Sequence, residues 1–71
     1  MTPQERELLT GMGNCHDACG EDFEGTVRMV AHARDLEPEA VKRTLARLRD
    51  QYSQAPEYQA LRGRLPNDFP M

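Results

Sequence analysis

The sequence predicts an all-α protein, a compact bundle of three to four short helices followed by an extended C-terminal tail. Apolar residues recur at separations of three and four along several segments, which is the periodicity of helices with one buried face. Prolines and glycines fall at the ends of these segments, where they favour helix starts and stops. The chain has 71 residues, and we expect one small helical domain over residues 1–71.

The first helix is predicted over residues 3–11. Thr2 and Glu5 have the spacing of a capping box, and Pro3 stands at the first helical position. Gly11 or Gly13 is expected to end the helix, because glycine readily adopts the left-handed conformation of a C-cap. The side chains expected to face the core are Leu8, Leu9 and Met12. The polar segment from residue 13 to 21 is predicted to be a loop.

The second and third helices are predicted over residues 23–35 and 38–52. Asp22 is suited to cap the second helix, and Pro38 is suited to begin the third. Each segment carries an apolar stripe at helical spacing, which predicts the face that packs on the core. The stripe residues are Phe23, Val27, Val30 and Ala31 in the second helix, and Val41, Leu45, Leu48 and Tyr52 in the third.

A short fourth helix is predicted over residues 56–62, between Pro56 and Gly63. The side chains expected to face inward are Tyr58, Leu61 and Leu65. Residues 64–71 contain two prolines, which remove backbone donors and restrict the residues before them. This segment is therefore predicted to be an extended tail, with Phe69 packed against the body of the domain.

Four residues in the middle of the chain follow a known spacing. Ala31, Leu36, Val41 and Leu45 are separated by five, five and four residues. Residues 26–45 therefore resemble the helix-turn-helix of bacterial transcription regulators. In that motif a small residue lets two helices approach, and apolar residues fill the angle between them. The resemblance implies that Leu36 is buried in the turn.

Two residues of this segment differ from the family pattern. Asp35 stands where the family usually has glycine, and aspartate tolerates a left-handed backbone better than most residues. Arg34 falls on the apolar stripe of the second helix. We expect its stem to lie over the core and its guanidinium to reach water.

The resemblance implies a function as well as a fold. In this family the second helix of the motif enters the major groove of duplex DNA, so residues 38–52 would be the recognition helix. The basic residues that would contact DNA are Lys42, Arg43, Arg47 and Arg49. A homodimer would be needed to recognise a specific site, because one module makes few base contacts. The alternative for these side chains is a solvated helix face, in which Glu39 is placed to pair with Arg43.

The charge of the chain favours a second class of function. The formal net charge is −3, and residues 1–25 contain six acidic residues and one arginine. A typical nucleic-acid-binding domain is basic overall. The sequence therefore also predicts, as the alternative, an acidic module that binds a protein partner and no nucleic acid.

Both cysteines lie in the predicted loop. Cys15 and Cys19 are four residues apart, and His16, Asp17 or the distant His32 could complete four ligands for zinc. Familiar zinc signatures use two cysteine pairs, and this chain has one. The same thiols could form a reversible disulfide. We expect reduced thiols without a metal role, and no cofactor.

The sequence predicts neither an enzyme nor a membrane protein. Cys15 and His16 are adjacent but lack an orienting partner, so no catalytic residue is assigned. No apolar run approaches the roughly 20 residues that cross a bilayer, and the first residues lack the pattern of a signal peptide. We therefore expect a cytoplasmic protein with no membrane partner.

Overall fold

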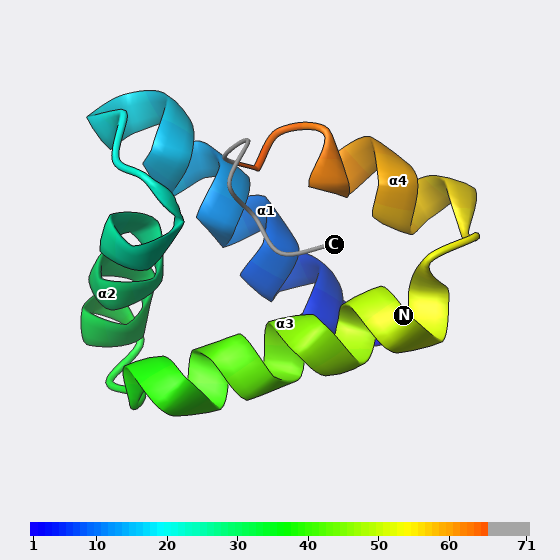
Figure 1. Ribbon diagram of the computed structural model, residues 1–71, viewed down its shortest axis with the longest axis horizontal. Helices are drawn as coiled ribbons and strands as arrows, with labels where there is room; N and C mark the ends of the chain where they lie inside the picture. The colour runs from blue at the N-terminus through cyan, green and yellow to red at the C-terminus, as the bar shows by residue number, and fades with distance from the viewer. Residues whose placement is uncertain (66–71) are drawn as a thin grey trace.

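The computed structural model describes residues 1–65 and contains four helices in that range. They are α1 (Pro3–Cys19), α2 (Phe23–Ala33), α3 (Pro38–Tyr52) and α4 (Pro56–Arg62), shown in Figure 1. Residues 1–65 contain no strand, which confirms the predicted all-α class. The bounds of α3 and α4 are those predicted. No helix of this range is long and apolar enough to span a membrane.

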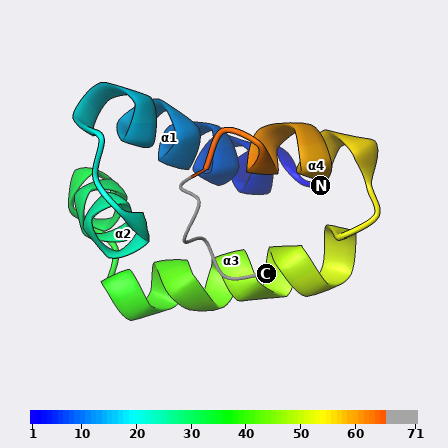
Figure 2. The ribbon, with the colours of Figure 1, turned by 45° about the horizontal axis from the view of Figure 1, so that its top comes forward.

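The helices are arranged around α2, which packs against both α1 and α3, while α4 packs against α1. In Figure 1, α2 lies crosswise to α3 at the N-terminal end of α3. In Figure 2, α1 and α4 lie together on one side of α3. This arrangement directs one face of α3 to the core and leaves the opposite face exposed.

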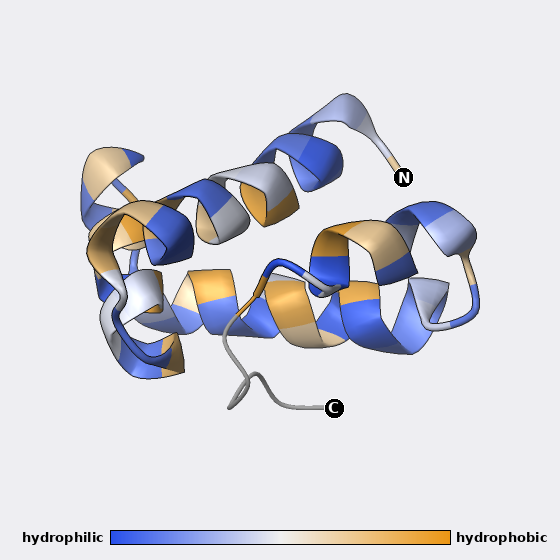
Figure 3. Cartoon of the chain, turned by 90° about the horizontal axis from the view of Figure 1, so that it is seen from above, coloured by the Kyte–Doolittle hydropathy of each residue, from blue (hydrophilic) through white to orange (hydrophobic). Residues whose placement is uncertain are grey.

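The core takes one apolar stripe from each helix. Along the ribbon of Figure 3, orange apolar bands alternate with blue hydrophilic ones, as expected for helices that bury one face. The buried apolar residues are Leu8, Leu9, Met12, Phe23, Val27, Val30, Ala31, Val41, Leu45, Leu48, Tyr58 and Leu65. The stripes predicted for α1, α2 and α3 are therefore confirmed, with Tyr52 half-buried at the end of the third.

α1 is longer than predicted. It continues through Gly11 and Gly13 and ends at Cys19, so the predicted end near residue 11 and the predicted loop over residues 13–21 are both wrong. Gly20 ends the helix instead. Its φ is 67°, and its backbone N–H donates to the carbonyl oxygen of His16 at 2.8 Å. A glycine C-cap was thus predicted correctly, but the prediction assigned it to Gly11 or Gly13 and the structure has it at Gly20.

The two glycines inside α1 lie at close approaches of other parts of the chain. A Cβ atom at Gly11 would be 2.8 Å from a guanidinium nitrogen of Arg34, and one at Gly13 would be 3.1 Å from Cβ of Arg64. Arg34 caps the C-terminus of α2, and Arg64 follows α4. These glycines therefore make room for neighbouring side chains and do not stop the helix.

The turn between α2 and α3 comprises residues 34–37, because α2 ends at Ala33, two residues earlier than predicted. Asp35 has a φ of 56°, the left-handed conformation that it was predicted to tolerate. The backbone N–H of Leu36 then donates to the carbonyl oxygen of Ala31 at 2.8 Å. Arg34 does not simply extend into water, since its guanidinium donates to the carbonyl oxygen of Glu7 on α1 at 3.1 Å.

The prediction that Leu36 fills the angle between α2 and α3 is wrong. Its side chain is 49% exposed, whereas Ala31, Val41 and Leu45 are buried as predicted. The core cluster already contains Val30 from α2 beside these residues. Asp35 adopts the left-handed conformation directly before Leu36, and the Leu36 side chain lies at the surface.

The chain turns back after α4. The backbone N–H of Gly63 donates to the carbonyl oxygen of Gln59 at 3.1 Å, and the backbone N–H of Leu65 donates to the carbonyl oxygen of Arg62 at 3.0 Å. The Leu65 side chain is buried. The predicted extended tail is therefore wrong at residues 64 and 65. Its remainder, including the predicted contact of Phe69, lies outside the described residues.

Candidate functional site

The four basic residues predicted to contact DNA all lie on α3, but they turn to different neighbours. The Nζ atom of Lys42 is 2.7 Å from Oε1 of Glu24 on α2 and 3.6 Å from Oε1 of Glu39. The hydrogen bond to Glu24 is the main reason that the pKa of Lys42 is raised. Glu39 thus pairs with Lys42 and not with Arg43 as the sequence suggested.

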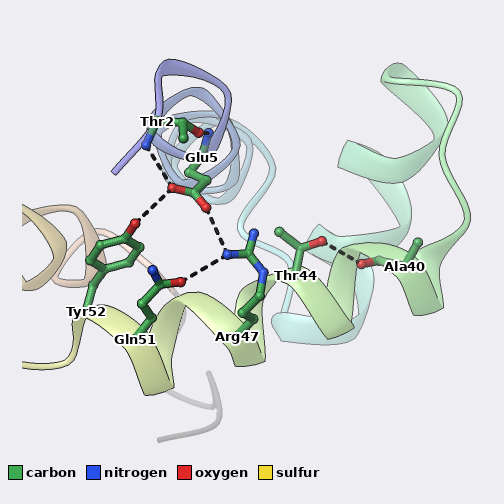
Figure 4. Close-up of polar contacts among 7 residues, drawn as sticks. All are labelled: Thr2, Glu5, Ala40, Thr44, Arg47, Gln51 and Tyr52. Atoms are coloured by element: carbon green, nitrogen blue, oxygen red, sulfur yellow. Dashed lines mark hydrogen bonds and ion pairs between the residues drawn. The ribbon is translucent and has the colours of Figure 1, made fainter.

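Arg47 turns toward the start of α1 (Figure 4). Its Nη1 atom lies 3.0 Å from Oε2 of Glu5 and 3.1 Å from the side-chain oxygen of Gln51. Glu5 also accepts hydrogen bonds from the backbone N–H of Thr2 at 2.8 Å and from the hydroxyl of Tyr52 at 3.3 Å. The Thr2 N–H, followed by Arg47 and Tyr52, lowers the pKa of Glu5 against the opposing effect of burial. The predicted capping box therefore also anchors α3.

The remaining two bases lie on other faces of α3. Arg49 pairs with its neighbour Asp50 at 3.1 Å. Arg43 lies on the exposed ridge of the helix, which reads Glu39, Arg43, Ala46 and Asp50 at helical spacing. The ridge thus has two acidic residues and one basic residue. Such a surface is typical of a solvated helix face.

Acidic residues also surround the N-terminal end of α3. Asp35 and Glu37 lie in the preceding turn, Glu39 lies in the first turn, and Glu24 lies on α2 beside Lys42. This is the end that a recognition helix presents to the major groove. Carboxylates at this end of the helix repel the phosphates that flank the major groove of DNA. Contact between α3 and DNA stays a prediction.

A groove of about 340 Å³ opens between the start of α1 and the α2–α3 turn. Its lining residues are Thr2, Gln4, Glu5, Leu8, Arg34, Leu36, Thr44 and Arg47. Among residues 1–65, Leu36 and Met29 are the large apolar side chains that remain exposed, and Leu36 is in this groove. Sequence reasoning missed the groove because it assigned Leu36 to the core. The local signal was the flanking pair of acidic residues, Asp35 and Glu37.

The two cysteines lie one turn apart near the C-terminal end of α1. Both are free thiols, with Cys15 half-buried against the core and Cys19 exposed. The Nδ1 atom of His16 lies 2.8 Å from the carbonyl oxygen of Glu21, and Asp17 is 2.7 Å from Arg64. Within residues 1–65, no three side chains of His, Cys, Asp or Glu gather as a metal-ligand group. The structure therefore does not bring together the zinc ligands considered from the sequence, His32 included.

The two thiols are expected to differ in reactivity. Burial, followed by the neighbouring Cys19 thiol and the Glu21 carboxylate, raises the pKa of Cys15. The thiolate is the nucleophile, so iodoacetamide at mildly alkaline pH should modify the exposed Cys19 several times faster than Cys15. Fragment-ion mass spectrometry of a quenched time course measures both rates. Unfolding in urea should bring the rates together, and equal rates in the native protein would contradict the difference in burial.

Comparisons of the chain with known protein families, curated proteins and solved structures found no match. Its function is therefore inferred from the geometry of its own residues.

Proposed function

We propose that the protein is a small binding module that holds an acidic, apolar segment of a partner protein in the groove between α1 and the α2–α3 turn. The observation that carries this proposal is Leu36, which is 49% exposed beside a concave surface. Covering the exposed half of a leucine side chain contributes roughly 1 kcal/mol. The groove floor adds a second apolar residue, Leu8.

The charged residues that line the groove favour a carboxylate in the occupant, even though Asp35 and Glu37 flank Leu36. Two guanidinium groups, those of Arg34 and Arg47, line the groove with one carboxylate, that of Glu5. Glu5 is only 11% exposed and already accepts three hydrogen bonds, whereas Arg34 donates to a neutral backbone carbonyl. Within residues 1–65, Arg34 thus makes no ion pair with a carboxylate. Arginine and carboxylate groups form short, charge-assisted hydrogen bonds. An acidic residue of the occupant is therefore the expected partner of Arg34.

Selection from a library of random peptides tests this proposal directly. The enriched peptides are expected to combine a leucine-like or aromatic side chain with aspartate or glutamate. Fluorescence anisotropy of a labelled enriched peptide should show about fivefold or greater weakening in the Leu36→Ser variant. The Arg34→Gln variant should reduce the preference for the acidic peptide over its amide analogue.

Met29→Ser is the matched control, because Met29 is 41% exposed on α2 but does not line the groove. This variant should bind the peptide as the wild type does. Enrichment of peptides without acidic residues, or equal binding by the Leu36→Ser variant, would overturn the proposal. Sedimentation that shows self-association lost in Leu36→Ser would identify a second copy of the chain as the occupant and reject the acidic segment.

Duplex DNA binding by α2 and α3 is the second candidate function. It is favoured by the buried Ala31, Val41 and Leu45 and by the short left-handed turn at Asp35, which agree with the helix-turn-helix resemblance. Our proposal expects no binding to random duplex DNA even at low salt. Binding that falls with salt and is weakened by the double change Arg43→Ala, Arg47→Ala would replace the peptide proposal with DNA binding.

A further inference from the structure

The Cys15 thiol, near the end of α1, lies close to two other sulfur-containing side chains, Cys19 on α1 and Met29 on α2. The Sγ atom of Cys15 lies 4.0 Å from the Sδ atom of Met29 on α2. Cys19 follows Cys15 by four residues on the same helix, so the two thiols share one face of α1. The influence of Cys19 on the Cys15 thiol agrees with this proximity. Met29 is 41% exposed and is not part of the core, so its sulfur atom is within reach of solvent.

The distances fit a metal ion in trigonal coordination. Metal–sulfur bonds in thiolate sites are about 2.3 Å long, so a trigonal ion separates its sulfur ligands by about 4.0 Å. The observed separation of Cys15 and Met29 has this value before any metal is bound. To complete the site, the exposed Cys19 side chain must turn its thiol toward Met29.

The donor atoms select the class of ion. Thiolate and thioether sulfur are soft ligands that favour Cu(I), whereas zinc usually takes four ligands in a tetrahedron. Two other donors of this part of the chain already have partners, the Nδ1 atom of His16 with the Glu21 carbonyl oxygen and Asp17 with Arg64. The cluster thus offers three soft donors, and one of them, the Met29 thioether, is outside the cysteine, histidine and carboxylate ligands that zinc takes.

We infer that Cys15, Cys19 and Met29 form a binding site for one Cu(I) ion per chain. Binding replaces the two thiol protons with two copper–thiolate bonds and adds one bond to the Met29 thioether. Two protons are released to solvent, and no electron is transferred. The ion links the end of α1 to α2 and leaves the groove at the start of α1 unoccupied, so this site is independent of the proposed peptide binding.

An anaerobic competition titration with Cu(I) and the chelator bathocuproine disulfonate tests the site on the full chain. We expect one Cu(I) per chain and a monomeric complex. The Met29→Leu variant keeps the size of the side chain and removes the sulfur donor. Loss of a group that only supports a metal ligand weakens metal binding roughly 10- to 100-fold. Because Met29→Leu removes a ligand itself, its Cu(I) affinity should fall by at least this factor. X-ray absorption should report three sulfur neighbours in the wild type and two in this variant.

His32→Gln is the matched control, because it removes a borderline donor from α2 and leaves the three sulfur atoms in place. This variant should bind Cu(I) as the wild type does, and circular dichroism should confirm that every variant is folded. Failure of the wild type to compete with the chelator would overturn the inference. Unchanged affinity in Met29→Leu, nitrogen ligation, or one ion shared between two chains would do the same.

Discussion

Replacing Leu45 with alanine is expected to lower the free energy of unfolding by about 2 to 5 kcal/mol. The Leu45 side chain is 2% exposed in the middle of α3, within the cluster that joins α3 to the rest of the core. Its removal leaves a cavity that the surrounding helices close only in part. Domains are typically stable by about 5 to 15 kcal/mol, so this is a large share of the total. Urea denaturation followed by circular dichroism measures the loss.

Leu36→Ala provides the matched comparison, because the same atoms are removed from a half-exposed position in the adjoining turn. This variant should change the free energy of unfolding by no more than about 0.5 kcal/mol. Similar losses in the two variants would contradict the packing of Leu45. They would also remove the structural basis of the helix-turn-helix resemblance.

Replacing Tyr58 with phenylalanine is expected to raise the free energy of unfolding by about 1 to 3 kcal/mol. Tyr58 is 4% exposed, and its hydroxyl has no hydrogen-bond partner among residues 1–65. Folding therefore removes the hydroxyl from water without replacing its hydrogen bonds. Phenylalanine retains the ring and omits the group that carries the desolvation penalty. Urea denaturation at neutral pH measures the gain.

Tyr52→Phe is the control of opposite sign, because the Tyr52 hydroxyl donates to Glu5 at 3.3 Å. This variant loses a hydrogen bond and should be destabilised by about 0.5 to 1.5 kcal/mol. A loss of stability in Tyr58→Phe would contradict the unpaired state of the buried hydroxyl.

The pH dependence of the Tyr58→Phe variant gives an independent check. Burial raises the pKa of Tyr58 in the folded protein, so the folded chain holds the phenolic proton more tightly than the unfolded chain does. The stability that comes from this tighter proton binding is fully present below the pKa of tyrosine in the unfolded chain, which is about 10. It is lost as the pH rises through the higher pKa of Tyr58 in the folded chain. The wild type should therefore lose stability relative to the variant above about pH 10.

The sequence was sufficient for the features that depend on local pattern. The apolar stripes, the Thr2 capping box, the bounds of α3 and the left-handed Asp35 are properties of a few neighbouring residues. The second half of α1 is different, because its polar residues find partners far away in the chain. Arg64 donates to Asn14 at 2.8 Å and to Asp17 at 2.7 Å. Local propensity therefore indicated a loop where tertiary contacts support a helix.

The candidate sites depend still more on distant contacts. Lys42 and Arg47 look like free cations on a helical wheel, yet Glu24 and Glu5 approach them from other helices. The groove exists because the turn directs Leu36 outward, which the spacing of apolar residues cannot distinguish from burial. The sulfur cluster required the correct length of α1 before Cys15 could be placed beside Met29.

The contacts of Arg64 also bear on the order in which the domain assembles. α2 and α3 are joined by a short turn and can pair early, because little loop entropy opposes their contact. Arg64 can contact the last turns of α1 only after the segment that follows α4 has docked. Arg6 and Glu57 form a second contact between α1 and α4, at 3.2 Å. We therefore expect the last turns of α1 and the segment from α4 to Leu65 to open together as one unit. When that unit opens in the native protein, amide protons near residues 14–19 should exchange together with those of residues 63–65, and the Cys15 thiol should become accessible in the same event.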